Sequence, residues 1–218
     1  MIIVIDGPAG SGKSSTARAV ADKLDIEYLD SGALYRTATL LYLEADRNEE
    51  LFFKLLQDKT ITFHYSNGCF HVAIEGESVT SRIRTIEVAE YVSEVAARPH
   101  VRQFVNDLMR DVVDRGTYIA EGRDLGTAVF PDADLKFYMS ADIEERARRR
   151  YEERKTDNPE LTLEQVKQNI EERDHKDSNR ETDPLKKAVD AIEVDTTNLS
   201  FEQQVDKICL EIRERLNS

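Results

Sequence analysis

Short apolar runs and amphipathic stretches alternate along this chain. The first run, Ile2 to Ile5, is continuous and mostly β-branched, which is typical of a strand buried on both faces of a parallel sheet. Four further runs have strand character, namely residues 26–30 (IEYLD), 117–122 (TYIAEG), 135–141 (LKFYMSA) and 191–197 (AIEVDTT). Helical patterns lie between the strands; the apolar residues from Ala17 to Leu24, for example, recur at helical spacing. This alternation predicts an α/β fold with a doubly wound parallel sheet.

Residues 60–80 interrupt the alternation. They hold two strand-like runs on either side of Asn67-Gly68. Asn-Gly is a strong hairpin signal, because a type I′ turn needs positive φ at both of its central residues. We therefore expect a single domain whose core comprises residues 1–59 and 81–218, with a small antiparallel β module inserted at about 60–80.

A second special segment is expected near the end of the chain. Residues 81–115 are helical again, with a break at Pro99. Residues 155–159 (KTDNP) have the composition of an exposed loop tip, and they lie between an Arg-rich helix and a charged one. A mobile segment suits such a place, so residues 151–170 are predicted to form a short helical lid.

Composition limits the possible partners. A chain of 218 residues with 40% hydrophobic content can bury one sizeable core. The formal charge of −13 argues against a nucleic acid polymer or an anionic membrane as partner. Two cysteines, Cys69 and Cys209, are too few for a disulfide framework and favour a reducing, cytoplasmic setting. Because no apolar run approaches the length of a membrane span and the first residues form a strand, we expect a soluble, unexported protein.

The stretch GPAGSGKSS joins the first strand to the first helix. Gly7 and Gly12 lack a Cβ, so the backbone can turn tightly and bring N–H groups against phosphate oxygens at a helix N-terminus. Lys13, as an exposed loop lysine, would reach the outer phosphates, and the Ser14 hydroxyl would ligate Mg²⁺. A glycine turn that fits the pattern by chance is the alternative, but the flanking strand and helix favour a phosphate-binding loop, or P-loop.

The P-loop by itself does not distinguish a kinase from a GTPase, a motor or an ATP-driven switch. A GTPase would carry an Asn-Lys-x-Asp segment for guanine, and the sequence has none. A motor or transporter ATPase would usually be longer or tied to partner domains. A small kinase needs a second anion site opposite the first, which directs attention to arginines in loops and at strand ends.

Two candidate anion-binding segments follow predicted strands. In DSGALYR, Ser31 is a good helix N-cap and the new helix carries Arg36; a capped helix with a solvated arginine is the alternative. In EGRDLGTAVFP, Arg123 and Asp124 follow a buried strand. Ligands of open α/β sheets bind outside the carboxyl ends of the strands, which favours a functional role over a surface turn.

Two further arginine-rich segments are helical. In ERDHKDSNR, the spacing of Arg173, Asp177 and Arg180 would place two guanidiniums and a carboxylate on one helical face. A surface salt bridge explains that spacing equally well. In residues 145–155 (ERARRRYEERK), the pattern predicts that most of the arginines lie on a solvated helical face and pair with glutamates, although one or two could reach a transferring phosphate.

These segments together resemble the bacterial cytidylate kinases, a family of nucleoside monophosphate kinases. The resemblance rests on GPAGSGKSS, DSGALYR, EGRDLGTAVFPDADLKFYMSA and the pattern RDxxDSxRxxxPLxxAxDAxxxDTT at residues 173–197, and it covers essentially the whole chain. The module at 60–80 is similar to the nucleotide-binding insert that separates this family from adenylate kinase. The resemblance implies a P-loop NTPase fold, Mg²⁺, transfer of the γ-phosphoryl group of ATP to CMP and dCMP, and a monomer.

The resemblance also assigns residues. It places ATP on Gly7, Pro8, Ala9, Gly10, Ser11, Gly12, Lys13, Ser14 and Ser15. It places the acceptor nucleotide and the transferring phosphate among Ser31, Arg36, Ser93, Arg102, Arg123, Asp124, Arg173, Asp177 and Arg180. Lys13, Arg123, Arg173 and Arg180 are the expected catalytic residues, and Ser14 the metal ligand. Ser93 and Arg102 rest on the resemblance alone, because their segment reads as an ordinary amphipathic helix.

Charge explains the residue types. The acceptor phosphate of CMP is largely dianionic at pH 7, since its second pKa is about 6, so no general base is required and none of the four histidines is assigned chemistry. The cations offset the repulsion between two anions. Another small-molecule P-loop kinase and a noncatalytic ATP-binding switch are the competing interpretations. Within the kinase hypothesis, Asp124 either accepts from the exocyclic amine of cytosine or merely orients Arg123.

Overall fold

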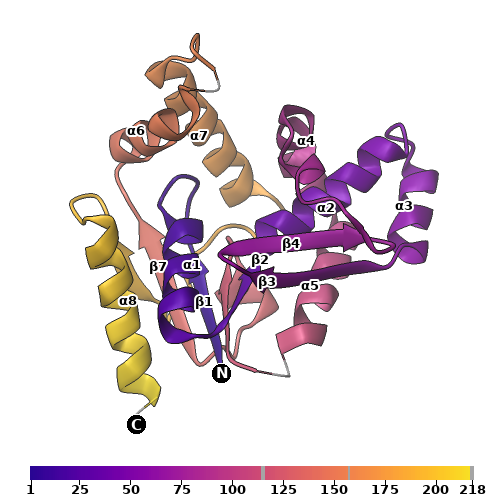
Figure 1. The fold of residues 1–218 in the computed structure, drawn as a ribbon. Coiled ribbons are helices and arrows are strands. Elements are labelled where there is room, and N and C mark those ends of the chain that lie inside the picture. The colour runs from indigo at the N-terminus through magenta and orange to yellow at the C-terminus, as the bar shows by residue number, and fades with distance from the viewer. Residues whose placement is uncertain (114–115, 157, 217–218) are drawn as a thin grey trace.

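A parallel sheet of five strands forms the centre of the molecule. The computed structural model describes residues 1–113, 116–156 and 158–216; residues 114, 115 and 157 of the predicted helical and loop segments lie outside the described residues. The strands lie in the order β2 (Glu27–Asp30), β6 (Tyr118–Glu121), β1 (Ile2–Asp6), β7 (Leu135–Ser140) and β8 (Ile192–Asp195). Every neighbouring pair is parallel (Figure 1). All five strands expected from the sequence are confirmed.

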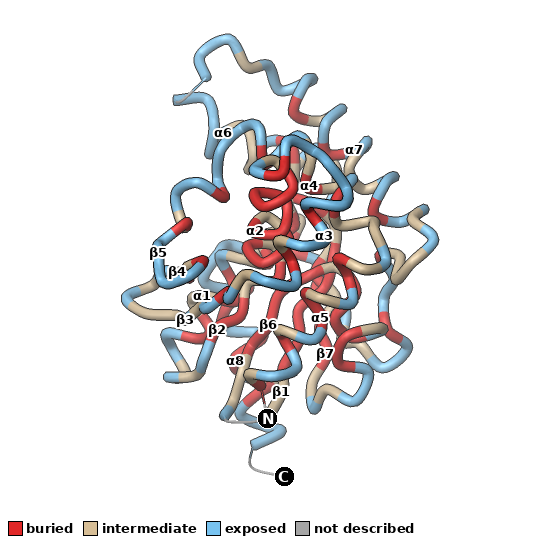
Figure 2. The backbone as a smooth tube through the Cα atoms, turned by 90° about the vertical axis from the view of Figure 1, so that its right-hand side faces the viewer, coloured by how far each residue is buried: buried red, intermediate tan, exposed pale blue. Residues whose placement is uncertain are grey.

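Helices cover both faces of this sheet (Figure 1). On one side, α1 (Lys13–Leu24) packs against α8 (Phe201–Leu216). The other side carries α2 (Ser31–Glu44), α4 (Ile86–Ala96) and α5 (Pro99–Val113), and α3 (Glu49–Asp58) packs on α2. Pro99 is the first residue of α5, where a missing N–H breaks no helical hydrogen bond. Buried backbone concentrates in the strands and in α2 (Figure 2), and the doubly wound α/β arrangement is confirmed. None of the helices in the described ranges is both long and apolar enough to cross a membrane.

A separate antiparallel sheet occupies the predicted insert. It consists of β3 (Ile61–Ser66), β4 (Cys69–Ile74) and the short β5 (Glu77–Ser78). At the turn between β3 and β4, Asn67 has φ 51° and Gly68 has φ 72°, the two positive values that a type I′ turn requires. Edge-to-face contacts of Tyr28 on β2 with Tyr65 and Phe70, which lie next to this turn, hold the turn end of the sheet against β2.

A pair of helices, α6 (Ile143–Arg154) and α7 (Leu163–Asn179), rises beyond the carboxyl ends of the strands (Figure 1). They share a small apolar cluster that contains Ala147, Val166 and Ile170. Thr162 and Gln165 form a capping box that fixes the start of α7. The segment predicted as a lid therefore spans the end of α6, the following loop and the first half of α7; its motion stays a prediction.

Candidate active site

The P-loop lies at the junction of β1 and α1, as the sequence predicts. Gly7 has φ +148°, and a Cβ there would lie 2.0 Å from the carbonyl oxygen of Met139, so only glycine fits between the loop and β7. Gly12 has φ +91° and stands immediately before the first residue of α1. The loop backbone thus curls around the N-terminus of a helix, the arrangement that binds phosphate oxygens through backbone N–H groups.

Lys13 is buried rather than exposed, which corrects the expectation of an exposed loop lysine. Only 4% of its surface is accessible, and Nζ donates a 2.7 Å hydrogen bond to the carbonyl oxygen of Pro8. Burial, followed by the positive charge of Arg123, lowers the pKa of Lys13 to about 7. The cation therefore lies folded onto the loop, in a place where a neighbouring anion would stabilise its charge.

Ser14 and Glu121 link the loop to the end of β6. The Ser14 hydroxyl donates a 2.7 Å hydrogen bond to Oε1 of Glu121. Nearby, Asp30 accepts a hydrogen bond from the backbone N–H of Ala33, so Asp30 and not Ser31 is the N-cap of α2. Burial raises the pKa of Asp30, and the negative charge of Glu121 raises it further. Glu121 was not among the predicted site residues, although its position at a strand end in EGRD was a usable signal.

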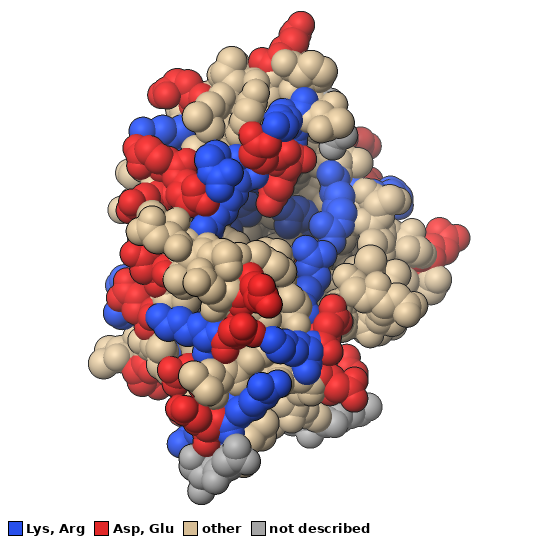
Figure 3. Space-filling view, turned by 60° about the vertical axis from the view of Figure 1, so that its left-hand side comes forward, with Lys and Arg blue, Asp and Glu red and all other residues tan. Residues whose placement is uncertain are grey.

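Three arginines from different elements lie near this region, namely Arg36 on α2, Arg123 and Arg173. Arg123, in the loop after β6, donates from Nε to Asp177 on α7 at 3.0 Å. Arg173, also on α7, has a buried Nε with no hydrogen-bond partner within the described part of the chain. Burial, then the positive charges of Arg123 and Arg36, lower the pKa of Arg173 to about 9. Figure 3 shows Lys and Arg side chains along a hollow in this face of the molecule.

Arg36, Arg123 and Arg173 form an arginine cluster, in which Arg123 is ion-paired with Asp177 and the charges of Arg123 and Arg36 lower the pKa of Arg173. A buried guanidinium nitrogen without a partner is costly, and a phosphate would supply both the missing hydrogen bond and an opposite charge. Among the arginines of α6, Arg150 adds to the cluster: burial lowers the pKa of Arg36, and the charge of Arg150 lowers it further. Arg150 is itself paired with Glu153 at 2.9 Å. Arg146 pairs with Asp174, and Arg148 and Arg149 pair with Glu145, so most of the α6 arginines have carboxylate partners, as the sequence predicts.

A second network surrounds Asp124. Its carboxylate pairs with the buried guanidinium of Arg102 and accepts a 2.7 Å hydrogen bond from Arg180. Asp183, which the sequence did not single out, accepts from Arg102 Nε at 2.9 Å and, through its carbonyl oxygen, from Arg180 Nε at 2.7 Å. Asp124 therefore orients Arg102 and Arg180. The suggestion that it orients Arg123 is wrong, because the carboxylate that holds Arg123 is that of Asp177.

The helix-face interpretation of residues 173–180 is also corrected. α7 ends at Asn179, so Arg180 lies outside the helix and turns toward Asp124. Asp177 is buried, 8% exposed, and its ion pair joins α7 to the loop after β6. A plain surface salt bridge within one helix therefore does not describe these residues.

The remaining predicted residues border the same region. The Ser31 hydroxyl donates a 2.7 Å hydrogen bond to the carbonyl oxygen of Glu121. Ser93 lines a cavity of about 390 Å³ together with Arg180 and residues of α4 and α7. Asp6, at the end of β1, was overlooked as a site residue: its two oxygens accept from the backbone N–H groups of Leu125 at 2.9 Å and Gly126 at 2.7 Å. It thereby fixes the loop that carries Arg123 and Asp124.

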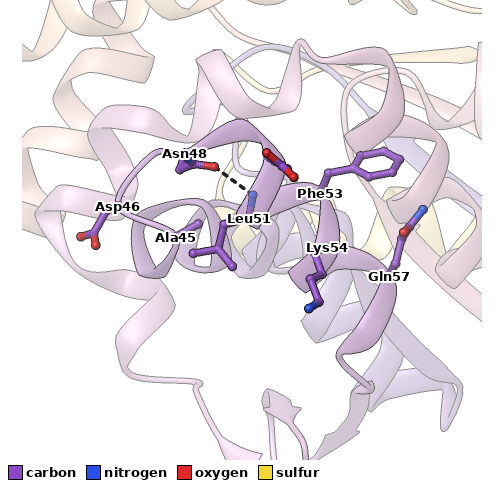
Figure 4. A pocket seen from close by; sticks show the side chains of 8 residues that line it. Ala45, Asp46, Asn48, Leu51, Phe53, Lys54 and Gln57 are labelled. Atoms are coloured by element: carbon purple, nitrogen blue, oxygen red, sulfur yellow. Dashed lines mark hydrogen bonds between the residues drawn. The ribbon is translucent and has the colours of Figure 1, made fainter.

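A cavity of about 670 Å³ lies elsewhere, at the turn between α2 and α3 (Figure 4). Its lining residues are Ala45, Asp46, Asn48, Glu50, Leu51, Phe53, Lys54 and Gln57, none of which belongs to the predicted site. Asn48 is already engaged as the N-cap of α3, accepting from the N–H of Leu51 at 3.0 Å. This cavity is therefore separate from the arginine cluster.

Comparisons with known proteins bear on the family and the fold of this chain. The family model described as cytidylate kinase matches residues 3–214. A cytidylate kinase of Fervidobacterium nodosum is 44% identical over 214 residues, which cover 98% of this chain and 96% of the relative. A cytidylate kinase of Geobacter sulfurreducens is 42% identical over 218 residues, covering 99% and 94%. The crystal structure of an uncharacterized protein from Eubacterium ventriosum has a TM-score of 0.51 at 13% identity, covers 100% and 99% of the two chains, and shares the fold.

Proposed function

The chain belongs to the cytidylate kinase family, and on that premise we propose how its site performs ATP-dependent phosphorylation of CMP. The γ-phosphoryl group of ATP passes directly to the phosphate of CMP, giving ADP and CDP, and dCMP is a second acceptor. The observation that carries the assignment of the acceptor site is Arg173, whose buried Nε lacks a partner in the described residues beside Arg123 and Arg36.

ATP binds to the P-loop, residues 7–15. Backbone N–H groups at the start of α1 hold the phosphates, and Lys13 leaves the carbonyl of Pro8 to reach the outer phosphate oxygens. A phosphate anion restores the protonated form of this buried lysine, because it supplies the opposite charge that the site otherwise lacks.

Phosphoryl transfer depends on charge compensation and alignment rather than on a general base. The acceptor phosphate is already nucleophilic near neutral pH, because its second pKa is about 6. Arg36, Arg123, Arg173 and Arg180 hold it in line with the γ-phosphorus and stabilise the charge on the equatorial oxygens. Ser31, Ser93, Arg102, Asp124 and Asp177 hold the base and the pentose of the acceptor.

The residues around Ser14 fit a magnesium ion that arrives with ATP. The Ser14 hydroxyl and the Glu121 carboxylate are 2.7 Å apart, and hard oxygen donors are the ligands that Mg²⁺ prefers. Ser14 would hold the ion directly, and Glu121 would accept from its bound water. The ion supplies neutralising charge at the β- and γ-phosphates. The described residues contain no group of three or more His, Cys, Asp or Glu side chains that could hold a metal, and Mg²⁺ in such sites draws most of its ligands from phosphates and water.

The surrounding elements complete the proposal. The β3–β5 sheet contacts the acceptor nucleotide, and the segment of residues 151–170 closes as a lid, excluding water that would otherwise hydrolyse ATP. The protein acts in the cytoplasm on dissolved nucleotides, as a monomer; its two cysteines, Cys69 and Cys209, are both free thiols.

A coupled assay of ADP formation with CMP, dCMP, UMP, AMP and GMP tests the proposal. We expect turnover that depends on CMP and dCMP and exceeds that with the other acceptors. Turnover with a different monophosphate alone would indicate another P-loop kinase. ATP binding without acceptor-dependent turnover would indicate a noncatalytic switch and refute the proposal.

A further inference from the structure

The third residue of the P-loop is held by the helices α6 and α7. The backbone N–H of Ala9 donates to Oδ1 of Asp174 at 2.9 Å. Its carbonyl oxygen accepts from the guanidinium of Arg146 at 3.0 Å. Arg146 and Asp174 also form an ion pair with one another. Both backbone polar groups of Ala9 are therefore bound by one charged pair, in which α6 supplies the cation and α7 the anion.

Packing reinforces these contacts. Ala9 is 6% exposed and belongs to the apolar cluster of Ala147, Val166 and Ile170 between the two helices. Gly10 has φ +76°, and an added Cβ would lie 3.1 Å from the carbonyl oxygen of Arg146, which is tighter than most Cβ contacts. Residues 9 and 10 of the loop are thus seated directly on α6 and α7.

The position of Asp174 on α7 also connects the P-loop to the arginines of the acceptor side. It lies next to Arg173 and on the same helix as Asp177, which holds Arg123. One helix therefore touches the P-loop through one carboxylate and the acceptor-side arginines through another. Displacement of α7 would change both at once.

We propose that Asp174 is a positioning residue for ATP. Its carboxylate fixes the amide of Ala9 and thereby the shape of the P-loop, while Arg146 neutralises a negative charge that would otherwise oppose the phosphates. This inference rests on the proposed function, since it names a residue that prepares the same loop for ATP, and it makes the affinity for ATP depend on how α6 and α7 are seated.

The test compares Asp174→Ala with a control in the same pair of helices. Glu144 on α6 and Lys167 on α7 form an exposed ion pair at 3.0 Å. Such a pair contributes little to stability, so Glu144→Gln removes a charge between the same two helices while leaving their seating and the contacts of Ala9 in place. Calorimetry gives the Kd for ATP and for CMP, and hydrogen exchange gives the protection of the Ala9 amide. We expect Asp174→Ala to raise the Kd for ATP about tenfold or more and to speed exchange at Ala9, with the Kd for CMP unchanged. Glu144→Gln should behave as the unaltered protein.

Asp174→Asn separates position from charge. The amide oxygen can still accept from Ala9, so we expect it to restore most of the ATP affinity that alanine loses. If Asp174→Ala does not fold, Arg146→Gln replaces it: the carboxylate loses its cation, and the Kd for ATP should again rise. An ATP Kd and Ala9 exchange in Asp174→Ala that match Glu144→Gln would overturn the proposal. Failure of the proposed function would be recognised separately, as a lack of CMP-dependent ADP formation by the unaltered protein.

Discussion

The carboxylate of Asp124 accepts a 2.7 Å hydrogen bond from Arg180. Its second oxygen pairs with Arg102, so two guanidiniums share one buried carboxylate. Burial nevertheless raises the pKa of Asp124, with both arginines acting to lower it. An ionised carboxylate has about four acceptor sites, so these contacts leave capacity for a donor on a bound base.

Substitution of Asp124 distinguishes base recognition from support of the arginines. The exocyclic amine of cytosine donates, whereas the corresponding carbonyl of uracil accepts and would be set against the carboxylate. If Asp124 reads the base, Asp124→Ala should shrink the CMP/UMP ratio of kcat/KM, because leaving a buried group unsatisfied costs about 1 to 3 kcal/mol. The measurement is kcat/KM for both nucleotides. An equal fall for both would mean that Asp124 only supports Arg102 and Arg180, and would leave base selection to Ser93 and Arg102.

Asp183 is expected to act on the same substrate through Arg102. Its φ of 47° places it in the left-handed region, which turns its carbonyl oxygen toward Arg180. Asp183→Gly keeps that backbone and removes only the carboxylate, so KM for CMP should rise while KM for ATP is unchanged. Asp183→Asn is the matched control, because asparagine tolerates positive φ and retains an acceptor oxygen. Equal KM values for CMP in all three proteins would remove Asp183 from the acceptor site.

The parts of the fold that the sequence predicted depend on local or repetitive signals. Strands buried on both faces read as continuous apolar runs, as in Ile2 to Ile5, and the type I′ turn at Asn67-Gly68 follows from the φ values of two residues. The glycines of the P-loop are equally local, because their spacing is set by the turn itself.

The partners of charged side chains were not predictable in the same way. Asp174 meets Ala9 across 165 positions of sequence, and Asp6 meets Gly126 across 120; such contacts depend on how β1, β6 and α7 are placed in space. The burial of Lys13 was equally hidden from the sequence, since the charges that act on it belong to Arg123, Glu121 and Arg173, far along the chain. The cap of α2 was misplaced by one residue, because Asp30 and Ser31 are both good N-caps.

Lys13→Met should abolish most of the activity while keeping the fold. One oriented electrostatic group is worth about 10² to 10³ in rate. The unfolding temperature should not fall, because methionine removes a buried cation without leaving a large cavity. Lys23→Met on the same helix is the control, since Lys23 is half-exposed in a surface ion pair with Asp206. Turnover of Lys13→Met close to that of Lys23→Met would contradict the P-loop assignment.

Arg173→Ala and Arg180→Ala test the acceptor side. We expect turnover to fall by orders of magnitude, with normal melting for Arg173→Ala because its buried Nε has no partner to lose in the described residues. Arg148→Ala, in a mainly exposed ion pair with Glu145, serves as control for removing a charge. Turnover and melting are measured on each variant. Kinetics of both acceptor-side variants equal to the control would take these arginines out of the active site.

Asp177→Ala should act more gently than either arginine variant. It removes the carboxylate that orients Arg123 at 3.0 Å but leaves every guanidinium in place. We expect a rise in KM for CMP, mainly through handling of the pentose, together with a moderate fall in kcat. The comparison of CMP with dCMP gives the pentose contribution. A kcat as low as that of Arg173→Ala would instead assign Asp177 a direct part in transfer.

The pH dependence of stability should reveal Asp6. Burial raises its pKa to about 6, against 3.8 for a free carboxyl, even though two backbone N–H groups bind it. Between about pH 4 and 6 the folded chain therefore holds a proton that the unfolded chain has lost, so the contribution of Asp6 to the free energy of unfolding falls as pH rises, by about 3 kcal/mol in total. Asp6→Asn does not titrate, and the difference in unfolding free energy between the two proteins should change by that amount across the window.

Asp6→Asn also tests whether the buried carboxylate of Asp6 is needed for activity. At pH 7.5 the ionised carboxylate accepts from both Leu125 and Gly126, whereas asparagine would direct its NH₂ group at one of these N–H donors. The loop that carries Arg123 and Asp124 should then shift, so Asp6→Asn should show a lower kcat/KM for CMP. Near neutral pH the variant should be no less stable than the unaltered protein, because it also removes a buried negative charge that burial disfavours. Denaturant unfolding from pH 4 to 7.5 and steady-state kinetics measure the two effects. A flat difference in stability would refute the raised pKa of Asp6, and unchanged kinetics would show that the loop is held by other contacts.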